Sequence, residues 1–509
     1  MLLLAPGCFK EPRDPVAERV ALFKDEMDDT RVQFPDGPLA LDAAIGHALE
    51  NNLSIRAAEL EFAIAHEITT YSALKQLPSL QADLSLTQRN KYNASSSRSL
   101  ESGRQSLEPS YSSEKFGHPS GVTLAWSLMD LGLGVLRNRQ TGERMRISGE
   151  NLRRLRQQIA METTMAYCRL RAAEDILDCA ASLEEAIALQ LRFNRQSNQE
   201  GSMAGTEVAK RAAPLLGGLK TLADLRKEAE TAKGSLAKAM GVTRPGALTL
   251  DKSTDWLDEL PPLPNDADAL YETAVTNRPE MYTADSETAI SRDEAKAALL
   301  QMAPNVNLSA SLHNNPDRYL VYNNWMEAAL QVSWDMLRFP LRHREAKTAG
   351  QRAELSALKR RMTAASVLVQ INLALTEMAA DDERMRLTEL IEENRRVILR
   401  GAEDAAGTGK GNRVDVLTER LRHVTDYAGM AWARSDYMAA KARLLSALGL
   451  DFFDSGWSPR VGGMPAGSPA PQVASSVLRD YKPPARSAAR VSLPLQPSEG
   501  GARAVAPGE

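Results

Sequence analysis

Short stretches of alternating hydrophobic and polar residues interrupt a chain whose pattern is otherwise helical. In residues 79–88, leucine and alanine take every second position, and polar side chains fill the positions between them. A period of two predicts a β-strand with one apolar face and one polar face. Residues 121–129 carry the same pattern, with the apolar face formed by Val122, Leu124, Trp126 and Leu128.

Long helices account for most of the remaining pattern. Residues 131–199 and 341–406 place apolar side chains at helical spacing, and neither segment contains proline. As a single helix, each segment would be about 100 Å long. Because so long a helix cannot bury an apolar face by itself, we expect coiled-coil packing with shorter helices at 206–240 and 414–448.

The pattern repeats at two fixed offsets along the chain. The larger offset carries "ALENNLSI" (48–55) onto "AVTNRPEM" (274–281), and the first strand onto an alternating stretch at 305–313. The smaller offset carries the second strand onto 328–336. The difference between the two offsets falls between the paired strands, so the first half has the longer polar loop, at 91–120.

The repeats define the domain organisation. Each half reads helix, strand, polar loop, strand, helix, turn and helix, with the first repeat at 39–241 and the second at 266–450. A short apolar leader (1–8) and an N-terminal extension (9–38) precede them. The tail, 456–509, is rich in proline, alanine, serine and glycine, which indicates disorder.

Composition narrows the function classes. The chain has 62 basic and 66 acidic residues, so its net charge does not indicate a nucleic-acid binder. Aromatic residues make up only 5% of the chain, which suits long helices better than a sandwich of many strands. No run approaches the roughly 18 apolar residues of a transmembrane helix, so we expect none.

Four strands among such long helices need a physical explanation. In water, the sheet would have two open edges and few residues to cover its faces. An apolar face opposite a polar face, over strands long enough to cross a bilayer when tilted, is typical of a transmembrane barrel with a wet lumen. Four strands cannot enclose a pore, so several chains would close one barrel together; the alternative is a small soluble cap on a helical rod.

The doubled layout resembles the TolC-like outer-membrane efflux proteins. The matching pieces, spread over about residues 39–450, are "LDAAIGHALENNLSI", "LPSL", "LAWSLMDLGLG", "GKGNRVDVLTERL" and "LLSALGL". The resemblance implies a mainly α-helical fold with a membrane β-barrel. Two tandem strand-helix repeats per chain would form a long coiled-coil α-barrel, and a homotrimer would share one 12-stranded barrel.

The function that the resemblance implies is a trimeric outer-membrane channel-tunnel, the exit duct of a tripartite efflux or type I secretion system. Its strands would lie in outer-membrane lipid and its helical tunnel in the periplasm, docked to a periplasmic adaptor protein and an inner-membrane transporter. The alternative is a periplasmic structural or adaptor-like coiled-coil protein without a membrane barrel. The sequence has no catalytic, phosphate-binding or histidine-ligand motif, so we expect no enzyme activity, cofactor, metal site or nucleic-acid partner.

The resemblance also assigns residues to the periplasmic tip of the tunnel. In the family, a glycine followed six residues later by an acid begins each returning helix. The matching positions are Gly201 with Glu207, and Gly409 with Asp415. Some members carry a second acid three residues further on and so have two acidic rings at the entrance; Thr418 stands at that position here, so we expect at most one ring.

Two further features of the returning helices follow from the residues themselves, without the family resemblance. Asn412 and Asp415 form a plausible capping pair, and an acid in a first helical turn gains about 0.3–1 kcal/mol from the helix dipole. Capping and a ring are compatible, because three capping acids around an axis still form a ring. Pro214 and the pair Gly217–Gly218 lie inside the first returning helix, where they should kink or weaken it.

Cysteine and tryptophan positions suggest contacts with a membrane. "MLLLAPGC" resembles a bacterial lipoprotein signal, which makes Cys8 a candidate lipid attachment site; the alternative is a chance apolar start with a buried thiol. Trp126 and Trp334 occupy equivalent places on two strands, as an aromatic girdle at a membrane interface would require, although packing between strand and helix explains them equally well. Cys168 and Cys179 have no ligand spacing and are expected to be small structural residues.

Overall fold

The computed structural model describes residues 15–29, 37–106, 108–243, 248–252, 257, 260 and 267–451. Cys8 and the tail at 456–509 lie outside the described residues. The helices are α1 (Pro15–Asp29), α2 (Leu41–Asn51), α3 (Leu53–Leu74), α4 (Leu128–Gln199), α5 (Gly205–Ala239), α6 (Ala267–Asn277), α7 (Pro279–Leu300), α8 (Phe339–Gly407) and α9 (Arg413–Ala447). The strands are β1 (Pro38–Leu39), β2 (Ser79–Leu84), β3 (Thr87–Gln88), β4 (Ala94–Ser95), β5 (Ser110–Tyr111), β6 (Phe116–Gly117), β7 (Ser120–Ser127), β8 (Thr249–Leu250), β9 (Asn305–Asn314) and β10 (Asn324–Ser333).

The prediction of a mainly helical chain is confirmed, and the repeat is visible in the helix lengths. The consecutive helices α2 and α3 have 11 and 22 residues, and α6 and α7 have the same two lengths in the same order. The returning helices α5 and α9 have 35 residues each. The long helices α4 and α8 begin and end within a few residues of the segments expected from the apolar spacing.

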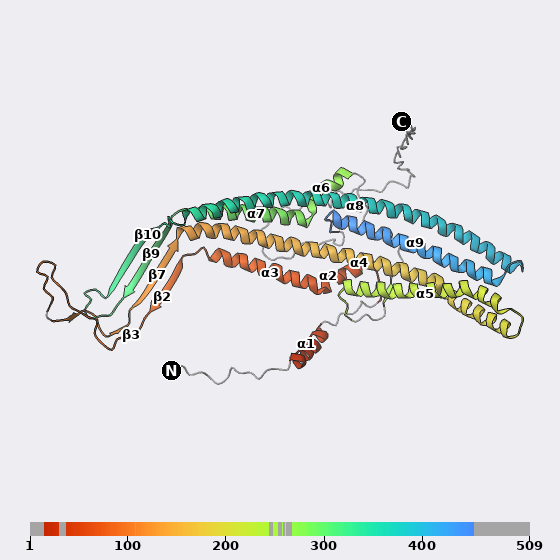
Figure 1. Cartoon of the computed structure of the whole chain (residues 1–509), viewed down its shortest axis with the longest axis horizontal. Helices are drawn as coiled ribbons and strands as arrows, with labels where there is room; N and C mark the ends of the chain where they lie inside the picture. Colours follow the sequence, from red (N-terminus) through yellow and green to blue (C-terminus); the bar gives the residue numbers. More distant parts are fainter. Residues whose placement is uncertain are drawn as a thin grey trace, which may run out of the picture. The chain divides into compact units, whose positions relative to one another are not determined.

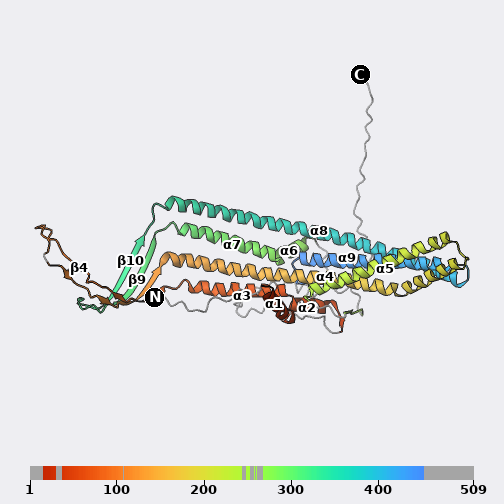
Figure 2. The same cartoon turned by 60° about the horizontal axis from the view of Figure 1, so that its bottom comes forward.

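The helices nearest the strands form one layer with the order α3, α4, α7, α8, because α3 packs on α4, α4 on α7, and α7 on α8. Figure 2 shows these four helices side by side. The main sheet has the matching order β2-β7-β9-β10, with all neighbours antiparallel, and it lies at one end of the layer (Figure 1). Towards the other end, α5 packs on α4, α4 on α9, and α9 on α8.

The strands differ from the expected ones at their ends. β2 stops at Leu84, and the expected strand 79–88 resumes only as the two-residue β3. The fourth strand lies at Asn324–Ser333 rather than 328–336. Its register is set by the hairpin with β9, in which Asn324 pairs with Asn314, and not by the repeat offset. The expectation that Trp334 lies on a strand is therefore wrong; it follows the strand directly.

The expected polar loop at 91–120 is exposed but is not irregular throughout. β3 pairs with β6 and β4 pairs with β5, so the segment continues the β2–β7 hairpin away from the helices. An isolated bridge between Arg98 and Gln105 extends the pairing further. The extra residues of the first half therefore form a long hairpin.

Pro214 and its neighbouring glycines do not interrupt α5, which runs from Gly205 to Ala239. Gly218 is buried where α5 approaches α9, and a Cβ atom at this position would lie 2.5 Å from both methyl carbons of Leu421. The missing side chain therefore permits close helix packing. The helix therefore continues through Pro214 and the two glycines, and the expected kink or weakening stays a prediction.

One described helix passes the length and composition test for a membrane span. An 18-residue window of α8 has a mean hydropathy of 1.3, and 17% of that window is buried. The expectation that no helix would be long and apolar enough to span a membrane is therefore wrong. The finding is weak evidence for a span, because α8 carries charged residues along most of its length and an apolar helix face that packs against protein passes the same test.

The hydrophobic core is thickest midway along the helices. There α2, α4, α5 and α9 pack together with the parallel pair β1–β8, which joins the start of the first repeat to the segment after α5. Tyr167 of α4 is almost fully buried, and its hydroxyl donates a hydrogen bond of 3.0 Å to the carbonyl of Leu39. This contact fixes β1 against the long helix.

Glycines with positive φ close the turns at both ends of the returning helices. Gly201 and Gly409 have φ of 71° and 73°, and Gly449, which follows α9, has φ of 71°. Gly449 also lies against the junction of α6 and α7, where a Cβ atom would be 2.8 Å from the backbone of Arg278. Gly409 has open space around it. Substitution of Gly409 therefore tests the cost of positive φ alone, whereas substitution of Gly449 tests this cost together with close packing.

We predict that Gly449→Ala destabilises the protein more than Gly409→Ala. The control substitution should cost about 1–2 kcal/mol, because an L-residue is disfavoured at positive φ. Gly449→Ala should add a further 1–3 kcal/mol, about the cost of overpacking, because the new methyl group meets backbone that cannot rotate away. Thermal melting of the helical circular dichroism signal of the purified protein in detergent measures both. Equal shifts in Tm would contradict the packing at Arg278.

Candidate functional site

The main sheet has two chemically distinct faces. On one face the side chains are apolar, and all of them except the half-buried Val306 are exposed, without cover from any described element. The other face carries mostly polar side chains. The apolar face consists of Leu80, Ala82, Leu84, Val122, Leu124, Trp126, Val306, Leu308, Ala310, Leu312, Met326, Ala328, Leu330 and Val332.

Both edges of the sheet are open. β2 pairs only with β7, and β10 pairs only with β9, among the described strands. Each edge therefore presents backbone N–H and C=O groups that have no strand partner within the described chain. An open edge beside an uncovered apolar face is an aggregation hazard in water. Only further strands or water could pair with these backbone groups.

The helices at the two edges of the layer also expose apolar stripes. On α3 the exposed residues Leu60, Ile64, Ile68 and Tyr71 follow one another at helical spacing. The 69-residue α8 buries only Ala346, Val367, Ile371, Ala374 and Glu392. Its exposed large apolar side chains are Phe339, Leu341, Leu355, Leu358, Met362, Leu368, Val369, Leu373, Leu387, Leu390, Ile391, Val397 and Ile398. Both stripes are suited to packing against further helices.

At the far end of the helices, the two turns have the same backbone hydrogen bonds. The amides of Ser202 and Met203 donate to the carbonyl of Ser197, at 3.0 and 3.2 Å. The amides of Lys410 and Gly411 donate to the carbonyl of Ala405 in the same way, both at 2.9 Å. Gly201 and Gly409 are the left-handed residues of these turns, as expected for a helix C-terminus that reverses the chain.

The acids of the two turns lie in different surroundings. Glu207 forms an ion pair with Arg211, at 3.1 Å. Asp415 is exposed, and its carboxylate has no ion pair within the described part of the chain. Asn412 is the N-cap of α9 and accepts from the amide of Val414 at 3.1 Å, while Thr418 donates its hydroxyl to the Val414 carbonyl. The cap is thus Asn412, and the Asp415 carboxylate is left to the solvent.

The two candidate girdle tryptophans lie in different settings. Trp126 is on the exposed apolar face of β7. Trp334 lies after β10, where its indole N–H donates to the carbonyl of Met302 at 3.2 Å and its ring meets Phe339 edge to face. A hydrogen-bonded, half-exposed indole fits the boundary between an apolar and a polar environment. The structure therefore gives Trp334 a packing role in addition to its position near the strand end.

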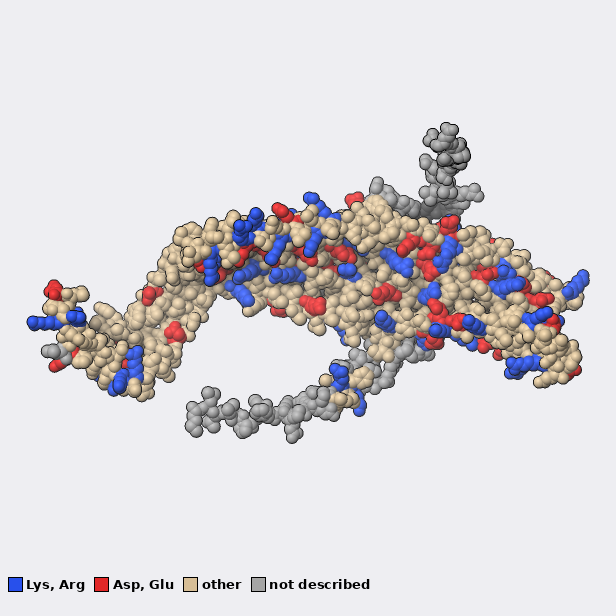
Figure 3. Space-filling view, in the orientation of Figure 1, with Lys and Arg blue, Asp and Glu red and all other residues tan. Residues whose placement is uncertain are grey.

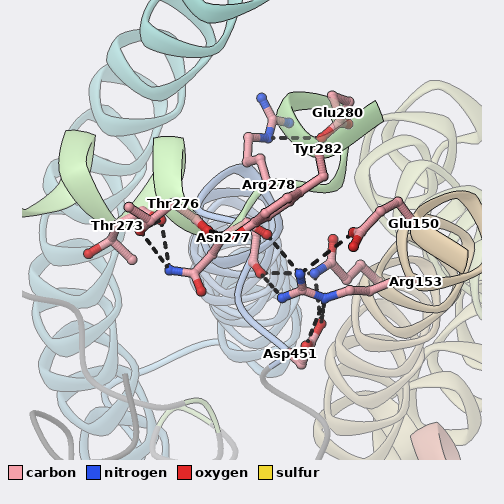
Figure 4. Close-up of polar contacts among 11 residues, drawn as sticks. Glu150, Arg153, Thr273, Thr276, Asn277, Arg278, Glu280, Tyr282 and Asp451 are labelled. Atoms are coloured by element: carbon pink, nitrogen blue, oxygen red, sulfur yellow. Dashed lines mark hydrogen bonds and ion pairs between the residues drawn. The ribbon is translucent and has the colours of Figure 1, made fainter. Parts of the chain in front are cut away.

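A buried polar cluster joins the two repeats near the middle of α4 (Figure 4). Arg153 of α4 forms an ion pair of 3.1 Å with Asp451 and donates to the carbonyls of Asn277 and Gly449 at 3.0 and 3.1 Å. Gln157, one turn later, donates to the same Gly449 carbonyl at 2.9 Å and to Asp451 at 2.7 Å. One helix of the first repeat thereby holds both the α6–α7 junction and the end of α9.

Glu150 of α4 also belongs to this cluster, but one of its carboxylate oxygens lacks a hydrogen bond. Its Oε2 atom is buried without a hydrogen-bond partner, and the Arg153 guanidinium is 3.9 Å away. Burial raises the pKa of the Glu150 carboxyl, the nearby Arg153 lowers it less, and the carboxylates of Asp451 and Glu280 raise it further. The fold therefore disfavours the ionised form of Glu150.

Three helices bring a second polar cluster together. His423 of α9 contacts the buried Glu392 of α8 at 3.1 Å, and its other ring nitrogen lies 4.0 Å from the sulfur of Cys179 on α4. Arg396 forms an ion pair of 2.7 Å with Glu392. Sequence reasoning missed this cluster, because its members are far apart in the chain and share no spacing. No group of three or more His, Cys, Asp or Glu side chains suited to a metal ion lies among the described residues.

Comparison with known families identifies the sequence pattern. Residues 44–242, most of the first repeat, match the family model described as outer membrane efflux protein. No curated protein sequence matches the chain. The second repeat lies outside the matched residues, so its likeness to the family rests on the fold.

Solved structures share the fold of most of the chain. The outer-membrane channel OprN is 18% identical, with a TM-score of 0.64, and the match covers 81% of this chain and 91% of that one. The open state of the Neisseria gonorrhoeae outer membrane channel MtrE gives 17% identity, a TM-score of 0.64 and coverage of 81% and 89%. The Campylobacter jejuni outer membrane channel CmeC is 14% identical, with a TM-score of 0.63, and the match covers 80% of this chain and 85% of that one. Together with the family match, this likeness of fold confirms the resemblance inferred from the sequence.

We predict that Glu150→Gln stabilises the protein at neutral pH. Because the pKa of Glu150 is raised in the folded state, native stability falls as pH rises from the usual carboxyl range through the folded-state pKa. Glutamine does not ionise, so the gain in Tm over the native protein should grow across that window and reach its full size above it. Melting curves at a series of pH values test this, with Glu185→Gln at an exposed site on α4 as the control. A gain that does not depend on pH would contradict the assignment.

Proposed function

We propose that this chain, similar in sequence pattern and fold to the outer membrane efflux proteins, forms a trimeric channel-tunnel across the outer membrane. The observation that carries the proposal is the four-stranded sheet, which combines an uncovered apolar face with two open edges. Three copies would supply 12 strands, with β2 of one protomer pairing with β10 of the next. A closed barrel satisfies every backbone group and places the apolar face in lipid and the polar face in the lumen.

The helical part supports the same closure. The stripe on α3 and the exposed face of α8 lie at opposite edges of the layer, so a ring of protomers would bring them together as a seam. Figure 3 shows charged side chains dense over the helices and sparse over the strands on the face viewed. A polar rod in the periplasm joined to an apolar band in lipid accounts for this distribution.

The helix turns would form the periplasmic end of the tunnel, since they lie at the opposite end from the strands (Figure 1). There they would dock with a periplasmic adaptor protein and an inner-membrane transporter, and the chain would act as the passive exit duct for efflux or type I secretion. The energy would come from the transporter. Lipid attachment at Cys8 stays a prediction and would add a second anchor to the outer membrane.

The competing function is a periplasmic coiled-coil protein with structural or adaptor-like roles. Its long helices would account for α4 and α8 equally well. It leaves the sheet unexplained, however, because a soluble protein would have to cover the apolar face or shorten and charge its edge strands. The alternating faces therefore favour the barrel.

We predict that arginine on the lipid-facing side of the sheet blocks membrane assembly. Leu84→Arg and Val332→Arg should each cost about 2–4 kcal/mol if the residue lies near the bilayer midplane, and less near an interface. Gln81→Arg and Gln331→Arg, on the polar face of the same strands, serve as matched controls and should assemble. Fractionation and native gel electrophoresis measure the outer-membrane oligomer. A soluble monomer that tolerates all four substitutions would favour the coiled-coil alternative.

We further propose that the three Asp415 carboxylates form a single acidic ring at the tunnel entrance. Negative charge in a narrow neck with low-dielectric walls attracts divalent cations. The effect should be modest, because Lys410 and Arg413 are exposed beside it and Thr418 replaces a second acid. Glu207, in the other turn, would add less negative charge at the entrance, since it is paired with Arg211.

Asp415→Asn should weaken block by Mg²⁺ added to the tip side of single channels in a planar bilayer. Glu207→Gln is the matched control in the other turn and should change the block little. Block that is equally strong in native and Asp415→Asn channels would show that Asp415 contributes to the first turn of α9 only.

A further inference from the structure

The polar face of the sheet is not chemically uniform along its length. In the cross-strand row farthest from the helices, Asp83 pairs with Gly121, Gly121 with His313, and His313 with Trp325. The next row towards the helices contains Glu327, paired with Ser311. The remaining positions of this face towards the helices carry small or amide side chains. We call Asp83, His313, Trp325 and Glu327 the distal belt.

The charge of the four strands is entirely acidic and lies in the distal belt. Asp83 and Glu327 are the charged residues of β2, β7, β9 and β10, which contain no lysine or arginine. Asp83 lies over Gly121, where a Cβ atom would be 3.3 Å from its Oδ1, so the glycine leaves room for the carboxylate. Glu327 is 3.9 Å from His313, whose Nε2 also contacts the Ser311 hydroxyl at 2.9 Å.

Trp325 breaks the alternation of the sheet. It shares the polar face with Glu327, although every neighbouring position on β10 that is apolar and large points to the other face. Its ring stacks on His313, with centroids 5.1 Å apart and planes at 23°, and it remains 41% exposed. Glu327 follows two residues later on the same face of β10, and an aromatic surface next to a carboxylate attracts planar cations.

Asp83 and Glu327 form no ion pair with a lysine or arginine among the described residues, and basic side chains of the adjoining loops have other contacts. In the adjoining loops, Arg318 is paired with Glu114, and Lys115 lies 4.1 Å from the centre of the Tyr92 ring. At the opposite end of the sheet, Lys75 and Arg137 line a hollow of about 570 Å³ that also contains Asp130. Lys75 and Arg137 therefore lie at the opposite end of the strands from the distal belt.

We infer that the distal belt makes the outer end of the conduit selective for cations and retards planar aromatic cations as they pass. This inference rests on the proposed function, which turns the polar face into the lumen wall. In a trimer, the belt places six carboxylates and three exposed tryptophan rings around one lumen. Like-charged rings with low-dielectric walls raise the local concentration of counter-ions, and the aromatic rings add stacking to a flat cation.

Two measurements on single channels of the full-length protein test the belt, both in the Asp415→Asn background so that the entrance does not contribute. The first is the reversal potential in a KCl gradient. The cation preference should fall at least about twofold in the double variant Asp83→Asn, Glu327→Gln, because the wall charge is removed. Glu101→Gln, an acid in the exposed hairpin at 91–120, is the control and should leave the potential unchanged.

The second measurement is the dwell time of ethidium, a planar aromatic cation, added from the loop side. Trp325→Leu should shorten the dwell time about threefold to fivefold, since a cation–π contact at an exposed site is lost. Trp325→Tyr keeps an aromatic ring and should retain most of the effect, which also guards against a general folding defect.

The outcomes separate the belt from the function on which it rests. Unchanged cation preference in the double variant, or an unchanged ethidium dwell time in Trp325→Leu, overturns the corresponding role of the belt while the channel itself stands. Native protein that forms no channels at all overturns the proposed function and the belt with it.

Discussion

Backbone hydrogen bonding at the edges of one small sheet constrains the whole chain. β2 and β10 each leave a row of amide and carbonyl groups without a strand partner in the described chain, and the sheet they bound has an uncovered apolar face. Neither water nor lipid alone resolves both problems, because water leaves the apolar face exposed and lipid leaves the edges unpaired. The barrel proposed above, in which further strands pair with both edges and lipid covers the apolar face, would resolve both problems. The long helices then follow the order that the strands impose.

The helices, like the sheet, leave apolar side chains uncovered at the two edges of their layer. α4 lies inside the layer and buries many side chains, whereas α8 lies at its edge and buries few. The cluster around Arg153 fixes the two repeats to each other at the level where the layer changes from α3, α4, α7 and α8 to α5, α4, α9 and α8. A protomer is thus well ordered internally and incomplete at its sides. This combination is expected of a subunit whose partners are copies of itself.

The sequence was sufficient for features that depend on local pattern. Apolar spacing at helical period predicted the helix ends closely, because propensity and apolar periodicity agree there, and the family resemblance supplied the turn glycines Gly201 and Gly409. β10 was displaced because its register depends on pairing with β9, a contact that the repeat offset does not encode. The cluster of Cys179, Glu392 and His423 and the stack of Trp325 on His313 arise from packing between distant segments. No spacing within one segment could have indicated them.

The unequal lengths of the two strand connections have a consequence for symmetry. The helices and main strands of the two repeats are near copies, so a ring of three chains would have six nearly equivalent positions around its wall. The extra residues of the first repeat all lie in the hairpin between β2 and β7, beyond the main sheet. The wall would therefore be approximately sixfold, while the rim facing the exterior would be strictly threefold, with long and short hairpins in alternation. An external molecule that binds the rim would meet three sites, whereas inside the conduit the backbone of the wall would approach sixfold symmetry and the distal belt would stay threefold.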